Sequence, residues 1–219
     1  ITCRDWSSDV CSSDLRVRLQ SRKNKLNQFL SLLKPVETDS ILEVGIANKE
    51  YSPTDNFLIK NYPYGHKNIT ALGIGDLMTF KKNYPEISTV SYDGRTFPFE
   101  DKQFDIVHSN AVIEHVGTFD RQLLFLKEMV RVSNSGMLTT PNRYFPIEVH
   151  TKVLFLHWFA KSFFDRVLNL LGKSWAAGDY MNLLSEAQLR QIIKSAGIEN
   201  YRIIRNRFMG LTMTLTLLW

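Results

Sequence analysis

The fold is decided by a short apolar run, ILEVG at residues 41–45, which reads as a buried strand that closes on a glycine. Three comparable runs follow, at 69–74, 88–92 and 104–108, with helical or turn-rich stretches between them. Their continuous apolar character is typical of parallel strands covered on both faces. We therefore expect an alternating α/β chain with right-handed crossovers.

A helix is predicted ahead of the first strand. Apolar side chains recur at helical spacing from Leu26 to Leu33, and Pro35 ends the pattern. We assign residues 16–40 to this N-terminal helical segment.

The chain ends in a different way from its beginning. A helix is signalled by a capping box at Ser185 and Gln188 and is terminated by Gly197. Two strands follow, at 201–208 and 211–219, and only two residues separate them. So short a connection requires an antiparallel hairpin. With a fifth parallel strand at Gly136–Thr140, the expected fold is a three-layer α/β sandwich around a mostly parallel seven-stranded sheet that ends in this hairpin.

Residues 1–15 differ in composition from the rest of the chain. They hold both cysteines, Cys3 and Cys11, and Asp5–Leu15 (DWSSDVCSSDL) reads as a translated sequencing-library adapter. The alternative is a genuine disordered arm. The remaining residues contain no cysteine, which excludes disulfides and thiolate metal sites there and favours a cytoplasmic protein.

The charge and hydropathy of the chain limit which binding partners are expected. The formal net charge is +5, with Lys and Arg scattered rather than clustered. This pattern favours a solvated surface, so nucleic acid is not the expected partner. No apolar run is long enough to span a membrane, although peripheral membrane contact stays open.

Polar residues and glycines follow each of the first four predicted strands. In an open α/β sheet, such residues line one crevice at the carboxyl ends of the strands, where ligands bind. The residues in question are Glu43, Gly45, Gly75, Asp76, Asp93, Gly94, Asn110, Glu114 and His115.

Four blocks of the sequence carry a family resemblance. They resemble successive motifs of class I S-adenosylmethionine-dependent methyltransferases, most closely the type 11 subgroup. The blocks are ILEVGIANKE (41–50), ALGIGDL (71–77), YDGRTFPFEDKQFDIVHSNAVIEHV (92–116) and LKEMVRVSNSGMLTTPNRYFP (126–146). The resemblance implies a Rossmann-like fold, a methyltransferase domain over residues 41–219, and S-adenosyl-L-methionine as cofactor.

The resemblance also implies roles for single residues. Glu43 and Gly45 match the turn that approaches the methionine portion of the cofactor. Asp93, with Gly94 beside it, matches the acid that accepts a hydrogen bond from the adenine amino group. Asn110 matches the residue that faces the amino-acid end of the cofactor.

The sequence departs from the family pattern in two motifs of the cofactor site. Ala47 and Lys49 replace the second and third glycines of the first motif, which implies a reshaped turn. The acid expected to grip the ribose comes one residue late, at Asp76. A nicotinamide site is disfavoured because its G-x-G-x-x-G turn is absent.

The residues that follow the fourth predicted strand include a candidate catalytic base and resemble a metal-binding motif. His115 is the candidate general base, with Glu114 as its orienting partner; the alternative is a helix-capping pair without a catalytic duty. The pair also resembles the E-x-x-E-H metal arrangement of ubiquinone-type and small-RNA methyltransferases. Ala111 replaces the first glutamate, so we predict no metal.

Residues 141–184 interrupt the strand–helix rhythm and are expected to form the acceptor side of the crevice. Asn142, Arg143, His150 and His157 are the candidate substrate-binding residues. The aromatic residues of this segment predict either a lid over a hydrophobic or lipid-linked acceptor or a helix packed on the sheet edge.

Together these features predict O-methylation of a small-molecule or a glycan- or lipid-linked acceptor. Two alternatives stay open. One is a catalytically silent binding module with a methyltransferase fold, suggested by Lys49 and the displaced Asp76. The other is an RNA methyltransferase, suggested by the positive charge.

Overall fold

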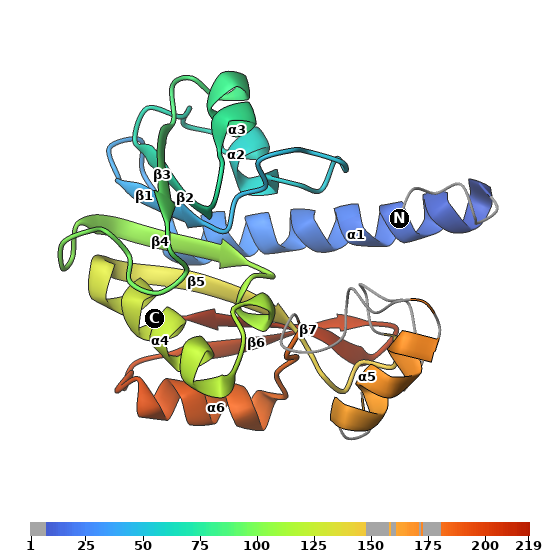
Figure 1. Ribbon diagram of the computed structural model, residues 1–219. Coiled ribbons are helices and arrows are strands. Elements are labelled where there is room, and N and C mark those ends of the chain that lie inside the picture. The colour runs from blue at the N-terminus through green and yellow to red at the C-terminus, as the bar shows by residue number, and fades with distance from the viewer. Residues whose placement is uncertain (1–7, 148–157, 159–160, 171, 173–180) are drawn as a thin grey trace.

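A computed structural model describes residues 8–147, 158, 161–170, 172 and 181–219. They form one seven-stranded sheet in the order β3-β2-β1-β4-β5-β7-β6 (Figure 1). The strands are β1 (Ile41–Val44), β2 (Ile69–Ile74), β3 (Ser88–Tyr92), β4 (Phe104–Asn110), β5 (Ser133–Pro141), β6 (Arg202–Phe208) and β7 (Leu211–Leu218).

The pairing of these strands confirms the predicted fold class. β1 pairs in parallel with β2 and β4, β2 with β3, and β4 with β5. β7 is antiparallel to both β5 and β6, so the sheet ends in the expected hairpin. β4 and β5 are longer than predicted because their polar ends, Asn110 and Ser133–Ser135, do not stand out in an apolar pattern.

Helices cover both faces of the sheet. Figure 1 shows α4 and α6 on one side and α1 crossing the other. The helical elements are α1 (Ser8–Gln28), the π-helical turn η2 (Phe29–Leu33), α2 (Phe57–Asn61), α3 (Met78–Asn83), the 3₁₀ turn η3 (Ile113–His115), α4 (Phe119–Val132), α5 (Lys161–Leu170) and α6 (Glu186–Ser195).

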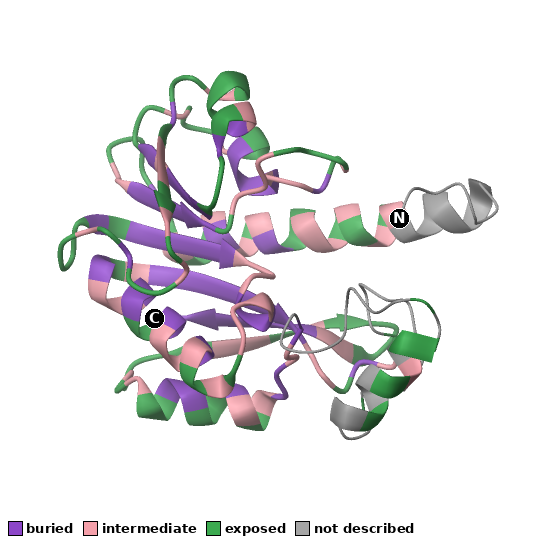
Figure 2. Ribbon diagram, viewed as in Figure 1, coloured by how far each residue is buried: buried purple, intermediate pink, exposed green. Residues whose placement is uncertain are grey.

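Two hydrophobic clusters fill the spaces between these layers. Leu42, Val107 and Leu138 point to one side, where residues of α4 and α6 join them. Their neighbours in sequence, Ile41 and Ile106, belong to the opposite cluster, with Phe29, Ile59 and Phe80. Successive strand residues therefore serve opposite faces, as expected for a sheet buried on both sides (Figure 2).

The N-terminal helix begins earlier than predicted. Residues 8–15 of the segment interpreted as an arm lie in α1, which continues to Gln28. No Gly or Pro occurs between Ser8 and Leu33, so nothing in that stretch breaks the helix. The helical stretch ends at Lys34, which has a φ of 50° and stands directly before Pro35.

The capping box of α6 is confirmed. Ser185 Oγ accepts a hydrogen bond from the Gln188 backbone N at 3.2 Å, and Ser185 N donates to Gln188 Oε1 at 3.0 Å. Gly197 follows the helix with a φ of 74°, the left-handed conformation that glycine adopts easily.

Candidate active site

The loops that leave the first four strands meet at one edge of the sheet. Gly45 N donates to Leu72 O at 2.8 Å, which joins the exits of β1 and β2. A Cβ atom on Gly45 would lie 2.2 Å from Val112 Cγ2, so the loop after β4 packs directly on the end of β1. Ser91 Oγ donates to Gly75 O at 2.8 Å and joins β3 to the exit of β2. The predicted site residues on these exits therefore share one edge.

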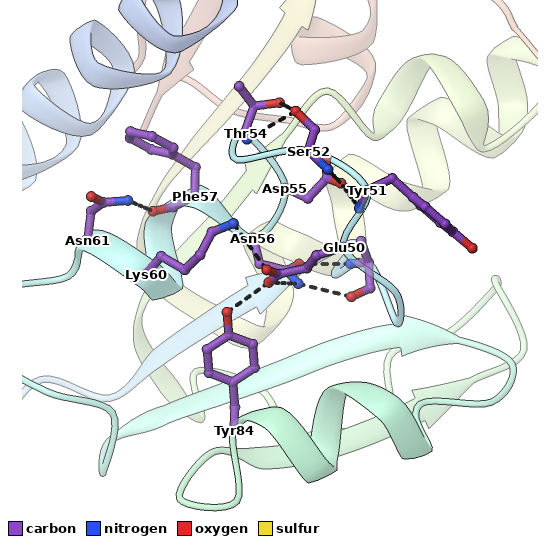
Figure 3. Close-up of polar contacts among 11 residues, drawn as sticks. Glu50, Tyr51, Ser52, Thr54, Asp55, Asn56, Phe57, Lys60, Asn61 and Tyr84 are labelled. Atoms are coloured by element: carbon purple, nitrogen blue, oxygen red, sulfur yellow. Dashed lines mark hydrogen bonds and ion pairs between the residues drawn. The ribbon is translucent and has the colours of Figure 1, made fainter. Parts of the chain in front are cut away.

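The glycine-poor turn after β1 is held by side chains (Figure 3). Asn56 Oδ1 accepts from Ala47 N, and Asn56 Nδ2 donates to Ala47 O, both at 2.9 Å. Asn56 itself has a φ of 48°. Its amide bridges the backbone at the position of the missing second glycine. Lys49, at the position of the third glycine, is exposed.

Glu50 anchors the same loop to its surroundings. Its carboxylate accepts hydrogen bonds from Tyr84 Oη at 2.7 Å, Asn56 Nδ2 at 2.8 Å and Lys60 Nζ at 3.2 Å (Figure 3). Partial burial opposes ionisation, but these bonds outweigh it and lower the pKa of Glu50. The loop is therefore fixed to α2 and to the end of α3.

The two acids after β2 and β3 lie on the exposed side of the edge. Asp76 Oδ1 accepts from Met78 N at 2.9 Å, and Asp93 Oδ1 accepts from Arg95 N at 2.9 Å. Each acid thus fixes its own turn while remaining exposed to solvent. A Cβ on Gly75 would meet no atom within 4 Å, so the backbone beside Asp76 is open. This arrangement fits a ligand that presents hydroxyl and amino donors.

The turn after Asp93 is clamped by α4. Phe97 N donates to Glu128 Oε2 at 2.7 Å, while Arg131 donates to Phe97 O at 3.0 Å and Phe99 O at 2.7 Å. The Arg131 guanidinium is the main reason that the pKa of Glu128 is lowered. Phe97 is buried, so it forms part of the core while fixing where the Asp93 turn lies.

The Glu43 side chain contacts a neighbouring strand of the sheet. Its Oε2 lies 2.5 Å from His108 Nδ1, the residue opposite it on β4. Both side chains are buried, and the ring of Phe29 packs on His108 with centroids 5.3 Å apart. The sequence analysis did not single out His108, because only the strand register brings it to Glu43.

Lys25, on α1, is a further site residue that the sequence analysis missed. Asn110 Oδ1 accepts hydrogen bonds from Thr139 Oγ1 and, at 3.3 Å, from Lys25 Nζ. Only 5% of Lys25 is exposed. Burial, followed by the nearby Arg22 guanidinium, lowers the pKa of Lys25 to about 7. A signal was available, since Lys25 stands four residues before Phe29 and hence on the same helix face.

Glu114 and His115 lie in η3, the 3₁₀ turn that follows Asn110 at the end of β4. Glu114 is 0% exposed, and its Oε2 accepts from Thr140 Oγ1 at 3.2 Å. Its Oε1 has no hydrogen-bond partner among the described residues and lies 4.0 Å from His115 Nε2. That separation is an ion-pair distance at its outer limit and is longer than a hydrogen bond.

The predicted acceptor-side segment starts and ends at neighbouring points. Asn142 donates through its backbone N to Met213 O and through Nδ2 to Thr212 O, both at 2.9 Å. Arg143 N donates to Leu184 O at 3.0 Å, so the two ends of the segment meet. The Asn142 side chain therefore ties β5 to β7. His150 and His157 lie outside the described residues.

The described ranges show neither a group of metal-ligating side chains nor a membrane-spanning helix. Within them, no three or more His, Cys, Asp or Glu side chains are grouped so that they could hold a metal ion. Among the helices of those ranges, none combines the length and the hydropathy needed to cross a bilayer.

Replacing Lys25 by Met should stabilise the protein at and below pH 7. Between pH 7 and the ordinary lysine pKa of 10.5 the unfolded chain binds more protons at Lys25, so in the wild type this group makes the free energy of unfolding rise with pH. The variant should be more stable by on the order of 1–3 kcal/mol at pH 7 and should lose this rise. Urea unfolding from pH 6 to pH 10 measures both effects, with the exposed Lys127→Met as control. Equal pH slopes in wild type and variant would contradict the burial of a charge at this position.

Comparisons with known proteins agree with this architecture. Residues 56–138 match the family model of a methyltransferase domain, the type 11 family. No curated protein sequence matches the chain significantly. A possible histamine N-methyltransferase from Thermotoga maritima is 13% identical with a TM-score of 0.59, over 96% of this chain and 93% of the other.

Two further structures have the same fold. The Synechocystis magnesium protoporphyrin IX methyltransferase with bound S-adenosylhomocysteine is 13% identical with a TM-score of 0.55, over 99% of this chain and 90% of its own. The CurJ carbon methyltransferase is 13% identical with a TM-score of 0.56 over 92% of this chain, which spans about half (53%) of the CurJ chain. Residues 56–138 thus match a methyltransferase domain model within a chain that has the fold of known methyltransferases, and these findings support the enzyme class and the cofactor, S-adenosylmethionine, that the motifs imply.

Proposed function

We propose that this protein transfers the methyl group of S-adenosylmethionine to an oxygen atom of a small-molecule or a glycan- or lipid-linked acceptor. The observation that carries the choice of oxygen is the buried Glu114 carboxylate beside His115, at the exit of β4. A hydroxyl is a poor nucleophile until a base takes its proton, so an oxygen acceptor requires such a group.

The crevice residues divide between cofactor and acceptor. Asp93 with Gly94 would accept from the adenine amino group, and Asp76 from the ribose. Gly45 and Asn110 would face the methionine portion, with Glu43 behind them. Bound there, the cofactor supplies a methyl group on a sulfonium, which is an excellent leaving group. The main task of the protein is then to align the acceptor, which supplies several kcal/mol.

His115 is the proposed base. Its imidazole is about one quarter exposed, so an acceptor can reach it, while Glu114 behind it is fully buried. When His115 takes the acceptor's proton it becomes cationic. A buried carboxylate 4.0 Å away stabilises that cation more strongly than it would in water. Asn142 and Arg143, at the start of the acceptor-side segment, are the proposed substrate contacts together with His150 and His157.

Replacing Asp93 by Ala should weaken the binding of S-adenosylhomocysteine by at least about 1 kcal/mol, the scale of one lost hydrogen bond. Titration calorimetry measures the change. Asp39→Ala is the matched control, because Asp39 also caps a backbone N, that of Val36 at 2.8 Å, but stands before β1 at the opposite edge of the sheet. An unchanged dissociation constant for Asp93→Ala would remove this residue from the adenine site.

Oxygen specificity is tested by transfer of a labelled methyl group from S-adenosylmethionine to matched acceptors. Phenols, hydroxylated sugars and prenyl-linked alcohols should take up label, whereas the corresponding amines should not. Label that appears only in amines, or on carbon, would reject O-methylation while leaving the methyltransferase class intact.

Replacing His115 by Ala should lower turnover of a hydroxyl acceptor by roughly 10²- to 10⁴-fold and leave the affinity for S-adenosylhomocysteine nearly unchanged. Glu114→Gln provides the companion variant, since it keeps the shape of the side chain and removes the charge. Unaltered turnover in His115→Ala would assign the base elsewhere.

One observation favours the silent binding module as a second candidate. The acid after β2 is displaced to Asp76, and one of its oxygens is already bonded to Met78 N. Absence of binding of both S-adenosylmethionine and S-adenosylhomocysteine at millimolar concentration would decide for the silent module. An RNA acceptor would instead reveal itself by RNA affinity that falls steeply with salt.

A further inference from the structure

The turn of the β6–β7 hairpin is apolar where turns are usually polar. It reads Phe208-Met209-Gly210-Leu211, and Met209 is 88% exposed and Leu211 53% exposed. Phe208 is also exposed. Hairpin turns normally carry Gly, Asn, Asp or Ser, because these residues suit both the conformation and the contact with water. Folding alone therefore does not explain why three large apolar side chains stand at a solvent-facing turn.

The topology brings this turn to the edge that carries the active site. β5 and β6 are both antiparallel to β7, so β6 runs parallel to β5 and ends at the same edge of the sheet. Pro141 on β5 pairs with Thr214, and the hairpin extends beyond it to the turn. Figures 1 and 2 show this exposed end of the hairpin on the side to which β4 and β5 point.

A second exposed segment adjoins the turn. Residues 142–147 follow β5, and Asn142 fastens their start to Thr212 and Met213 on β7. Phe145 is buried and anchors the segment, whereas Tyr144 is 61% exposed and Ile147 is also exposed. We call the five exposed apolar residues of the two segments the tip surface: Tyr144, Ile147, Phe208, Met209 and Leu211.

The charges of these two segments have one sign. Residues 141–147 and 206–214 contain Arg143 and Arg207 and neither Asp nor Glu. Arg207 is exposed beside the turn. Aromatic and aliphatic side chains flanked by arginine suit the boundary between lipid headgroups and acyl chains, especially where the lipids are anionic.

We propose that the tip surface docks on an anionic lipid bilayer. Docking there directs the carboxyl edge of the sheet, and with it the active-site crevice, toward the membrane. The inference rests on the proposed function only for the acceptor. It narrows that acceptor to a lipid-linked molecule presented at the bilayer surface.

The test is co-sedimentation of the full chain with vesicles of phosphatidylcholine, with and without phosphatidylglycerol. The wild type should bind the vesicles that contain phosphatidylglycerol, and added salt should weaken this binding. Leu211→Glu should reduce it at least tenfold. Val36→Glu is the matched control, because Val36 is equally exposed at 53% but precedes β1 at the opposite edge, and it should bind like the wild type.

A second variant covers the case in which Leu211→Glu does not fold. Met209→Asn removes the most exposed apolar side chain, and asparagine tolerates the φ of 50° found there. Circular dichroism should show the wild-type fold, while vesicle binding should fall. Undiminished binding in this variant, or equal binding to vesicles without phosphatidylglycerol, would overturn the proposal.

Self-association is the competing outcome. If the wild type forms dimers that Met209→Asn dissolves, and no vesicles are bound, the tip surface is an interface between two copies and the proposal is wrong. Vesicle binding is measured without cofactor or acceptor. Its failure is therefore distinguishable from a failure of the proposed methyl transfer.

Discussion

The close approach of Gly45 to Val112 is the constraint on which the site depends. At 2.2 Å from Val112 Cγ2 there is no room for a Cβ, and the φ of +90° at Gly45 disfavours any other residue. Through this contact the loop after β4 packs directly on the end of β1. Asn110, Glu114 and His115 are carried by that loop or stand next to it, so their distance from the turn after β1 is set by this one glycine. Of the three glycines in the family's turn, this chain keeps the one that its own packing requires.

The candidate site also depends on the position of helix α1. The sheet face beneath it is polar toward the carboxyl edge, where buried groups must find partners. Gln28 Nε2 donates to Asn206 Oδ1 at 2.6 Å, and Gln28 Oε1 accepts from Thr216 Oγ1 at 3.2 Å. These bonds to β6 and β7 fix the position of the helix, and Lys25 one turn earlier reaches Asn110 as a result. The helix thus links the hairpin to the residues at the end of β4.

The boundaries of the strands were predicted from the sequence more accurately than the side-chain contacts between strands. β1, β2 and β3 have the predicted boundaries because continuous apolar runs bounded by turns are a local signal. The gathering of Asp76, Asp93 and Asn110 at one edge was also predictable, since it follows from parallel topology. The Glu43–His108 pair and the Lys25–Asn110 bond were not, because each depends on register or helix placement between residues far apart in the chain. The 4.0 Å separation between Glu114 Oε1 and His115 Nε2 was likewise not readable from the sequence, since it depends on how the two side chains leave the 3₁₀ turn.

The balance of charge around Asn110 connects these features to the chemistry. A sulfonium is cationic, so a fully protonated amine held at the end of β4 would oppose its approach. Burial and the neighbouring Arg22 bring the pKa of Lys25 to about 7, and a second cation nearby lowers it further. Lys25 can therefore lose its proton near neutral pH when a positive ligand enters.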